Sequence, residues 1–491
     1  MARNKRRALA FGIAAVAVAG CVTAEAQAPQ TAGRITPQEA QQGAQYHPQF
    51  LAEFGGAMSG PQAAYVEQVG KNIAVQSGLG NARDAFTVSL LNSPVNNAFA
   101  VPGGYIYTTR QLVSLMNSEA ELAAVLGHEV GHVAARHSQR RQQAATRNSI
   151  LGVLGAIGSS ILLGDSQIGQ TVSRGLLEGS QLLTLRFSRQ QELQADDLGI
   201  QYLARAGYDR RAMGTVLASL AAQNALDARL TGQNASVPAW ASTHPDPASR
   251  VQSALQKAGN GGGVTNRDTF LTRIDGLLYG DDPQQGVIEG STFIHPALRF
   301  AFTAPQGYYM TNGTRAVSIQ GQGGGQAQLT TAAYSGNLET YVRQQFQALG
   351  GQNSQLAPTA LQRTTINGLQ AVYGTARVNS GNQQVDVVVV GYEFARDQAF
   401  HFAAIAPAGR AGTFDGMFRS MRRITPSEAG SVVPRKLQVV TVARGDTVAS
   451  LARRMAFDSA QEDRFRVLNA LGSREEVTPG QKVKLVVRAA R

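Results

Sequence analysis

His128-Glu129-Val130-Gly131-His132 is the stretch that decides the expected fold, because it lies in a segment with helical periodicity. Ser118 can cap the start of this helix with Glu121 at the capping-box position, and the next apolar positions form one stripe: Leu122, Val125 and Leu126. The two histidines are four residues apart, so they share one helix face and their imidazoles can converge on a metal ion. A helix with two unrelated histidines is the weaker alternative in a chain that has only seven histidines.

The expected metal is zinc, because zinc accepts imidazole ligands and lowers the pKa of a bound water to roughly 7. Glu129 directly follows the first histidine, which places it as the general base toward that water. A catalytic zinc needs a third protein ligand, and the stretch from Phe187 to Asp196 predicts another helix with Glu192 and Asp196 one turn apart. Glu192 can reach the metal while Asp196 accepts a histidine N–H. A solvated acidic helix face is the alternative, and this segment taken alone favours it.

Several motifs in this order resemble the HtpX-like and BepA-like zinc metallopeptidases, relatives of the CaaX prenyl endopeptidases within the gluzincins. The family pattern is HExxH on one helix, ExxxD on a later helix, and a downstream His-Pro followed by an arginine. The chain has Ser242-Thr243-His244-Pro245 with Arg250 at the family spacing, and Asn97 to Gly104 upstream. It lacks the membrane helices of the HtpX branch and the helical repeats of the BepA branch.

The resemblance implies that zinc is bound by His128, His132 and Glu192, with Glu129 as general base. Asp196 is then an outer partner of the ligands or a proton donor. His244 and Arg250 stabilise the oxyanion of the tetrahedral intermediate, or His244 caps the zinc in a resting state. An oxyanion donor is worth about 10²- to 10³-fold in rate, whereas a fourth protein ligand would exclude water.

The segment upstream of this helix predicts an edge strand that can bind substrate, made of Asn97, Ala98, Phe99 and Ala100 and ended by Pro102. Its free backbone can pair with an extended peptide, which selects side chains weakly and suits an enzyme that cuts unfolded proteins. An ordinary edge strand is the alternative. The other histidines lack partners at ligand spacing and are interpreted as structural or solvated: His47, His137, His295 and His401. The glycine-spaced run Ile150 to Leu163 is a lid, a membrane-contacting loop or a buried helix.

The first residues, 1–21, are expected to be a signal peptide, because basic residues precede an apolar run too short to span a bilayer. That run ends at Cys21, the only cysteine, in a motif resembling the lipobox of bacterial lipoproteins. A simple signal cut after Ala24-Glu25-Ala26 is the alternative. The prediction is an exported, periplasmic protein, attached to the outer membrane by a lipid on Cys21.

The length of 491 residues predicts an α+β multidomain protein. Its expected units are a mainly helical zincin-type metallopeptidase domain with a small edge-exposed sheet, residues 33–258, and a small α+β domain of unknown role, residues 290–425. The formal net charge is +12, but the basic residues are scattered without interleaved aromatics, so nucleic acid is not an expected partner.

Residues 437–488 resemble a LysM domain, in which two helices pack on a two-stranded sheet in the order βααβ. The segments that carry the resemblance are Val440 to Thr447, Val467 to Asn469 and Thr478 to Val483. Gly445-Asp446-Thr447 can end a strand and cap a helix, and Pro479-Gly480 can end the second helical part. The resemblance implies binding to peptidoglycan.

The sequence therefore predicts a zinc metalloendopeptidase of the bacterial cell envelope with one zinc per chain. Its expected substrates are unfolded or misassembled envelope proteins. Two alternatives remain, a LysM-directed peptidoglycan hydrolase and a non-catalytic assembly scaffold. Both are weaker, because the chain lacks the His-x-His motif of many cell-wall peptidases and keeps Glu129 beside its ligands.

Overall fold

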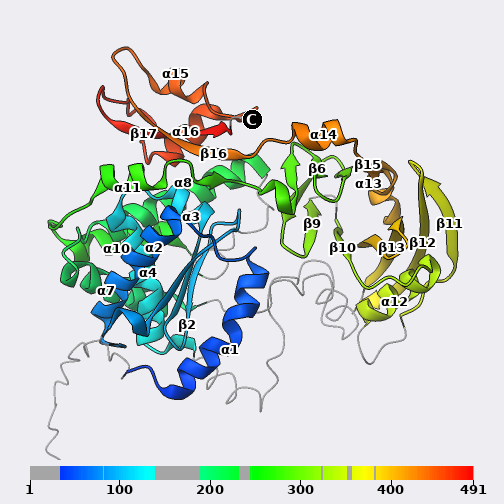
Figure 1. Ribbon diagram of the computed structural model, residues 1–491, viewed down its shortest axis with the longest axis horizontal. Coiled ribbons are helices and arrows are strands. Elements are labelled where there is room, and N and C mark those ends of the chain that lie inside the picture. Colours follow the sequence, from blue (N-terminus) through cyan, green and yellow to red (C-terminus); the bar gives the residue numbers. More distant parts are fainter. Residues whose placement is uncertain are drawn as a thin grey trace, which may run out of the picture.

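The structure is a computed structural model that describes residues 34–80, 82–138, 187–231, 244, 246–321, 324–350, 356–380 and 383–489. The expected signal peptide with Cys21 and the run Ile150 to Leu163 lie outside these residues. Among the described helices, none combines the length and hydrophobicity that a membrane span needs. The described elements mix helices and sheets in several units, which agrees with the predicted α+β multidomain class (Figure 1).

The N-terminal region is mainly helical and encloses a small sheet (Figure 1). The sheet has the order β1-β3-β2, with β1 parallel and β2 antiparallel to the central strand, so β2 is an edge strand. The strands are β1 (Thr87–Leu91), β2 (Ala98–Val101) and β3 (Tyr105–Thr109). The helices are α1 (Pro37–Glu53), α2 (Pro61–Ala74), α3 (Arg110–Leu115), α4 (Glu119–Ala134), α7 (Arg189–Arg205), α8 (Ala212–Thr231), α10 (Pro247–Ala258) and α11 (Arg267–Ile274).

Helix α4 is the central element of this region, and almost all of its residues are buried. It begins as the sequence predicts, since the Ser118 hydroxyl accepts the backbone N–H of Glu121 at 3.2 Å. Helix α7 packs closely against α4 where glycines remove side chains from the contact. A Cβ on Gly131 would lie 3.0 Å from the Ala195 carbonyl oxygen, tighter than ordinary van der Waals contact. The glycine inside His128–His132 therefore brings the acidic residues of α7 close to the histidines of α4.

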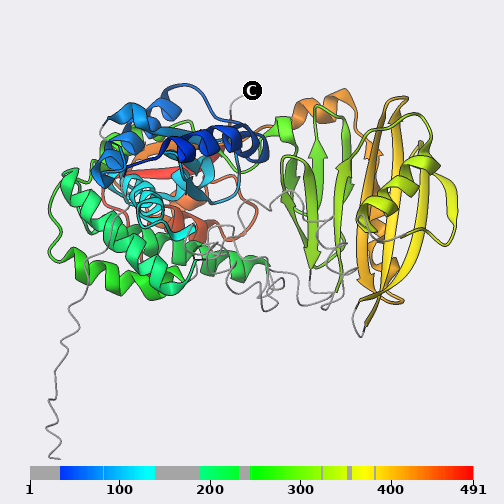
Figure 2. The ribbon, with the colours of Figure 1, turned by 90° about the horizontal axis from the view of Figure 1, so that it is seen from below.

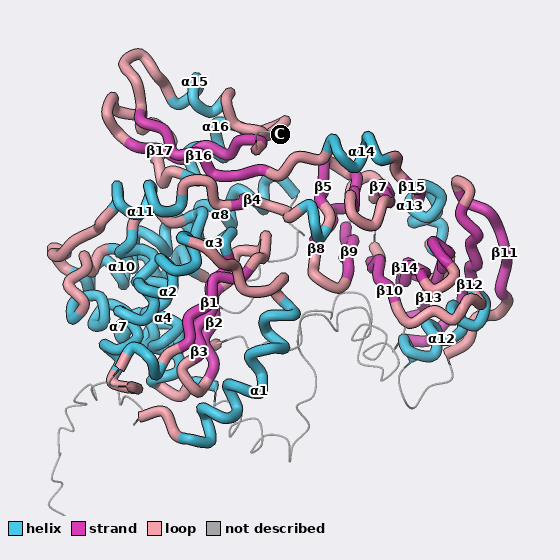
Figure 3. Tube along the Cα trace, viewed as in Figure 1, coloured by secondary structure: helices cyan, strands magenta, loops and turns pink. Residues whose placement is uncertain are grey.

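The middle region is dominated by a seven-stranded antiparallel sheet of order β11-β12-β13-β14-β10-β9-β8, which stands beside the helical region (Figures 2 and 3). Apolar residues bury both faces. One face packs on α12, and the other on β7 and α13. The strands of this sheet are β8 (Tyr308–Asn312), β9 (Ala316–Gly321), β10 (Gln326–Thr331), β11 (Leu361–Ile366), β12 (Leu369–Ser380), β13 (Gln383–Ala395) and β14 (Gln398–Pro407).

A smaller sheet of order β15-β7-β6-β5 and three helices complete the middle region. Two neighbouring strands of the seven-stranded sheet, β13 and β14, contain the largely apolar runs Val385 to Phe394 and Phe400 to Ile405. The other elements are β5 (Val287–Glu289), β6 (Thr292–His295), β7 (Phe300–Thr303), α12 (Leu338–Gly350), α13 (Asp415–Ser420), β15 (Arg422–Arg423) and α14 (Pro426–Ser431).

The C-terminal region follows the order strand, helix, helix, strand and shares the hydrophobic core of the helical region. Its strands β16 (Arg435–Thr441) and β17 (Lys482–Arg488) are antiparallel, and β16 also pairs with β4 (Leu278–Tyr279). Helices α15 (Val448–Ala452) and α16 (Gln461–Leu468) lie between these strands in sequence, and α16 packs against α8.

One buried lysine of the C-terminal region forms hydrogen bonds to the helical region. The Lys484 side chain has no solvent exposure, and its Nζ donates to the carbonyl oxygens of Ser114, at 2.8 Å, of Leu115 and of Met116. These carbonyls lie at the C-terminal end of α3, where a helix leaves its last C=O groups without internal partners and a hydrogen-bond donor is favourable. A C-terminal region held by such a contact is part of the helical body.

We expect Lys484→Met to destabilise the chain by about 2–4 kcal/mol, because the apolar side chain leaves buried carbonyls without a donor. Urea unfolding followed by circular dichroism measures this change. The matched control is Lys482→Met, since Lys482 is half-buried on the same strand and, among the described residues, donates to the exposed Thr272 hydroxyl. Equal unfolding midpoints for the two variants would contradict a stabilising role of the contact between Lys484 and the end of α3.

Candidate metal centre

Four buried side chains from three parts of the chain meet beside α4. They are His128 and His132 from α4, Glu192 from α7, and His244 just before α10. Each offers one ligand atom, and these atoms all lie within 4.8 Å of one another. The structure therefore brings the three predicted zinc ligands together and adds His244 to them.

The distances between the ligand atoms fit a tetrahedral zinc site. Zinc–nitrogen bonds of about 2.0 Å place the ligands of a tetrahedral ion about 3.3 Å apart. The Nε2 atoms of His128 and His132 are 3.0 Å apart, and each lies 3.6 and 3.4 Å, respectively, from a Glu192 oxygen. His244 Nδ1 is 3.3 Å from His128 Nε2 and 3.1 Å from Glu192 Oε1. This donor set of nitrogens and one carboxylate can bind one zinc ion.

Asp196 and Arg250 hold the ligands from outside. Asp196 Oδ1 lies 2.8 Å from His128 Nδ1, which directs Nε2 of that imidazole into the centre. Arg250, from α10, donates through Nε to Asp196 Oδ2 at 2.8 Å and also bonds Glu192 through Nη1. The guanidinium thus neutralises two carboxylates that are themselves buried. Predicted from the sequence as an oxyanion stabiliser, Arg250 here contacts the protein's own acidic groups.

The charged groups of the centre lower the pKa values of its two acidic residues, Asp196 and Glu192. Burial raises the pKa of Asp196, but the bonds from His128 and Arg250 outweigh this effect and hold its pKa at about 2. Burial also raises the pKa of Glu192, yet the neighbouring imidazoles, His244 first, bring the net pKa well below its usual value. Both carboxylates are therefore ionised at neutral pH, and Glu192 is ready to bind a cation.

Glu129 differs from these acids because it has no strong partner. Its side chain is buried, and burial raises its pKa to about 8, opposed by the nearby His244. Its Oε1 lies 3.5 Å from His244 Nε2 and accepts no hydrogen bond from the described residues. A buried acceptor of this kind, placed beside the ligand group, is suited to hold a water molecule.

His137 is a member of the centre that the sequence analysis missed. From the sequence, His137 was interpreted as structural or solvated. In the structure its side chain is buried, and its Nδ1 lies 2.8 Å from His132 Nδ1. Its Nε2 lies 3.0 Å from Gln194 Oε1 on α7. Phe187 stacks on the ring face of His132, with ring centroids 3.9 Å apart. The spacing His-x₄-His was the available signal, but on a continuous helix it does not place both rings on one face.

The other histidines stay apart from the centre. His47 and His401 each bond a tyrosine hydroxyl at 2.8 Å, those of Tyr107 and Tyr341. His295 stacks near Phe300 in the middle region. These contacts agree with the structural interpretation of the three residues.

Strand β2 passes next to α4 with its outer edge unpaired by the sheet. The N–H of Thr109 donates to the Asn97 carbonyl at 3.0 Å, and Ala98 lies opposite Thr108. Because hydrogen-bonded and non-bonded pairs alternate along an antiparallel ladder, Ala98 and Ala100 direct their backbone N–H and C=O groups away from β3.

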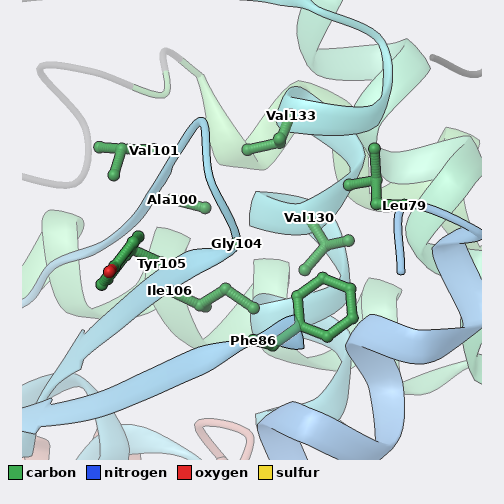
Figure 4. A pocket seen from close by; sticks show the side chains of 9 residues that line it. All are labelled: Leu79, Phe86, Ala100, Val101, Gly104, Tyr105, Ile106, Val130 and Val133. Atoms are coloured by element: carbon green, nitrogen blue, oxygen red, sulfur yellow. The ribbon is translucent and has the colours of Figure 1, made fainter. Parts of the chain in front are cut away.

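Two small hollows flank this strand. One lies under the β2–β3 turn, and Figure 4 shows that its lining is apolar apart from the Tyr105 hydroxyl. The other is lined by the metal-centre residue His132, by Ala100 of β2, and by Glu39, Pro102, Val133, Arg136 and Ser138. The second hollow therefore connects the edge strand with the metal centre.

Comparisons with known proteins give matches to the same region. Residues 61–258 match the model of "Peptidase family M48". The Escherichia coli (strain K12) "Beta-barrel assembly-enhancing protease" is 33% identical over 195 residues, which are 40% of this chain and 38% of that protein. The Schizosaccharomyces pombe "Mitochondrial metalloendopeptidase OMA1" is 30% identical over 207 residues, 42% of this chain and 56% of that protein. "Metalloprotease LoiP" of Escherichia coli (strain K12) is 33% identical over 127 residues, 26% of this chain and 47% of that protein.

The chain thus spans less than two thirds of the length of each of these relatives. The match includes α4, α7, His244 and Arg250, and so contains every residue that forms the metal centre. Residues 61–258 of the chain are a peptidase family M48 domain.

Proposed function

We propose that the chain is a zinc-dependent endopeptidase of the bacterial cell envelope that hydrolyses peptide bonds of unfolded or misassembled envelope proteins. The observation that carries the proposal is the buried group His128, His132, Glu192 and His244 with Glu129 at its side. The similarity to proteins named as proteases and metalloendopeptidases supports the reaction class. The similarity to a β-barrel assembly-enhancing protease supports envelope proteins as substrates.

In this proposal His128, His132 and Glu192 hold one zinc ion, which supplies Lewis acidity that activates water and polarises a carbonyl. Glu129 accepts a proton from the attacking water and passes it to the leaving amine. Its position beside the ligand group suits both transfers, because a carboxylate there can take a proton from water and give it to the amine. Asp196 orients His128, and Arg250 keeps Asp196 and Glu192 ionised and in place.

His244 has a regulatory place in the proposed cycle. Its Nδ1 lies among the ligand atoms, which supports the proposal that His244 would be a fourth ligand of a bound zinc ion. Four protein ligands are typical of structural zinc sites, whereas catalytic sites keep a position open for water. Turnover then requires His244 to leave the metal, after which its imidazole can donate to the developing oxyanion.

We further propose that substrates add as a strand to the edge formed by Asn97, Ala98, Phe99 and Ala100. The outward-facing backbone groups of Ala98 and Ala100 support this binding mode. The hollow beside His132 is a suitable place for one substrate side chain. Main-chain recognition would make the enzyme tolerant of sequence and dependent on unfolded segments.

The same proposal includes the cellular location of the protein and the division of the chain into domains. The protein is exported to the periplasm and held at the outer membrane through a lipid on Cys21, and residues 437–488 are a LysM-like module that binds peptidoglycan. Residues 33–258 and 290–425 are the other two domains. The similarity to the Escherichia coli β-barrel assembly-enhancing protease supports the location. The intact set of ligands and Glu129 favours the peptidase over a scaffold.

The test compares the chain from residue 22 onward with its His244→Ala variant, measuring zinc content and casein cleavage. We expect roughly one zinc in each protein and cleavage at least about 10-fold faster in the variant, because the metal gains an open position. A loss of about 10²- to 10³-fold would instead assign His244 to oxyanion stabilisation. Absence of both zinc and cleavage, after zinc is resupplied, would refute the proposed function.

A further inference from the structure

We infer that His137 is a positioning residue for the metal site, because it accepts the Nδ1–H of the ligand His132 and thereby fixes its tautomer and ring orientation. The inference rests on the proposed zinc site. His137 is 1% exposed, and it lies five residues after His132 rather than at the four-residue spacing of the two ligands. It is therefore a histidine outside the HExxH pattern that nevertheless contacts a ligand directly.

If Nε2 of His132 binds the metal, the contacts among the described residues fit the following assignment of protons. His132 directs Nε2 toward His128 and Glu192, so Nε2 must be unprotonated to bind a metal and Nδ1 must carry the proton. That N–H points at His137 Nδ1, 2.8 Å away, which must then act as acceptor. His137 in turn carries its proton on Nε2, which faces the Gln194 carbonyl oxygen at 3.0 Å. In this series of hydrogen bonds, from His132 through His137 to Gln194, each donor then faces an acceptor.

The backbone turn after α4 creates this contact. The helix ends at Ala134, and Arg136 adopts a left-handed conformation with φ of 52°. This conformation at a helix C-terminus usually falls to glycine, because a side chain there costs about 1–2 kcal/mol. An ion pair between Arg136 and Glu39 of α1 holds the turn. The turn at Arg136 places the His137 ring against His132.

The two α4 ligands therefore have different outer partners. His128 donates to a carboxylate, Asp196, whereas His132 donates to a neutral imidazole. Metal-binding histidines almost always give their second N–H to such an acceptor, and loss of the acceptor typically costs 10- to 100-fold in metal affinity or activity. The role of His137 predicts a loss of this size without any change in the ligands themselves.

The test uses two variants of the full-length chain, His137→Phe and His137→Asn. Phenylalanine fills the space but has no acceptor, while the Oδ1 of asparagine can take the place of Nδ1. We expect His137→Phe to weaken zinc binding by about 10- to 100-fold in chelator competition and to alter the visible spectrum of the cobalt-substituted protein. His137→Asn should remain within about 3-fold of the parent affinity. The matched control is His401→Phe, which removes a buried histidine far from the centre and should leave zinc affinity unchanged.

Parent-like zinc affinity in His137→Phe would overturn the inference, and so would equal losses in both variants, which would indicate packing alone. These measurements require zinc binding and no proteolysis. A chain that binds zinc with the expected variant pattern but cleaves no protein would refute the proposed function and leave the role of His137 intact.

Discussion

Glu129→Gln is expected to lower the rate of casein cleavage by about 10²- to 10⁴-fold while zinc content stays at the parent level. The substitution keeps the size of the side chain but removes the group that takes a proton from water. Glu129 is not among the grouped ligands, so the metal site should survive. Initial cleavage rates of matched protein samples, with zinc measured on the same samples, check this result.

The matched control is Glu119→Gln on the same helix. Glu119 accepts hydrogen bonds from Tyr65 and Tyr208 at the start of α4 and has no contact with the metal centre. Its variant should keep the parent cleavage rate. A Glu129→Gln protein that cleaves casein within about 2-fold of the parent would show that another group acts as the base.

Arg250→Met is expected to destabilise the chain by about 3–5 kcal/mol and to weaken zinc binding. The guanidinium bonds Asp196 and Glu192, and all three groups are buried. Methionine of similar length leaves two buried negative charges without a cation. Their repulsion then favours protonation, and a protonated Glu192 is a poor ligand. Urea unfolding of zinc-free protein measures the stability, and chelator competition measures the affinity.

Arg205→Met is the control for Arg250→Met. Arg205 is exposed at the end of α7 and donates to the Gln76 carbonyl, so its loss should change stability by less than about 1 kcal/mol. The loss of stability in Arg250→Lys should lie between those of Arg205→Met and Arg250→Met, since an ammonium keeps the positive charge but cannot form the forked contact with both carboxylates. If zinc-free Arg250→Met unfolded at the same urea concentration as the parent, the guanidinium would not be the group that balances these charges.

Local periodicity was sufficient to predict much of the metal centre. The four-residue spacing of His128 and His132 defines a helix face, and the same spacing of Glu192 and Asp196 defines another. The structure brings these faces together. The meeting itself was expected from the family resemblance, because periodicity within one helix does not show which other helix it contacts.

The parts that sequence reasoning missed depend on contacts between distant segments. On a continuous helix a spacing of five residues turns a side chain by about 140° relative to its start, which separates His137 from His132. After α4, however, Arg136 adopts a left-handed conformation and pairs with Glu39 from another helix, and this turn brings His137 to His132. The burial of Lys484 likewise depends on the end of α3, some hundreds of residues earlier in the sequence. Neither contact leaves a periodic signal.

The pairing of β4 with β16 makes the middle region an insertion. Tyr279 lies opposite Arg435 in an antiparallel register, so the chain leaves the helical body and returns to it at neighbouring points, about 5 Å apart. A short turn could in principle join these points and preserve the sheet β17-β16-β4. The seven-stranded sheet therefore belongs to an insertion that begins and ends at adjacent strands of the body that carries the metal centre.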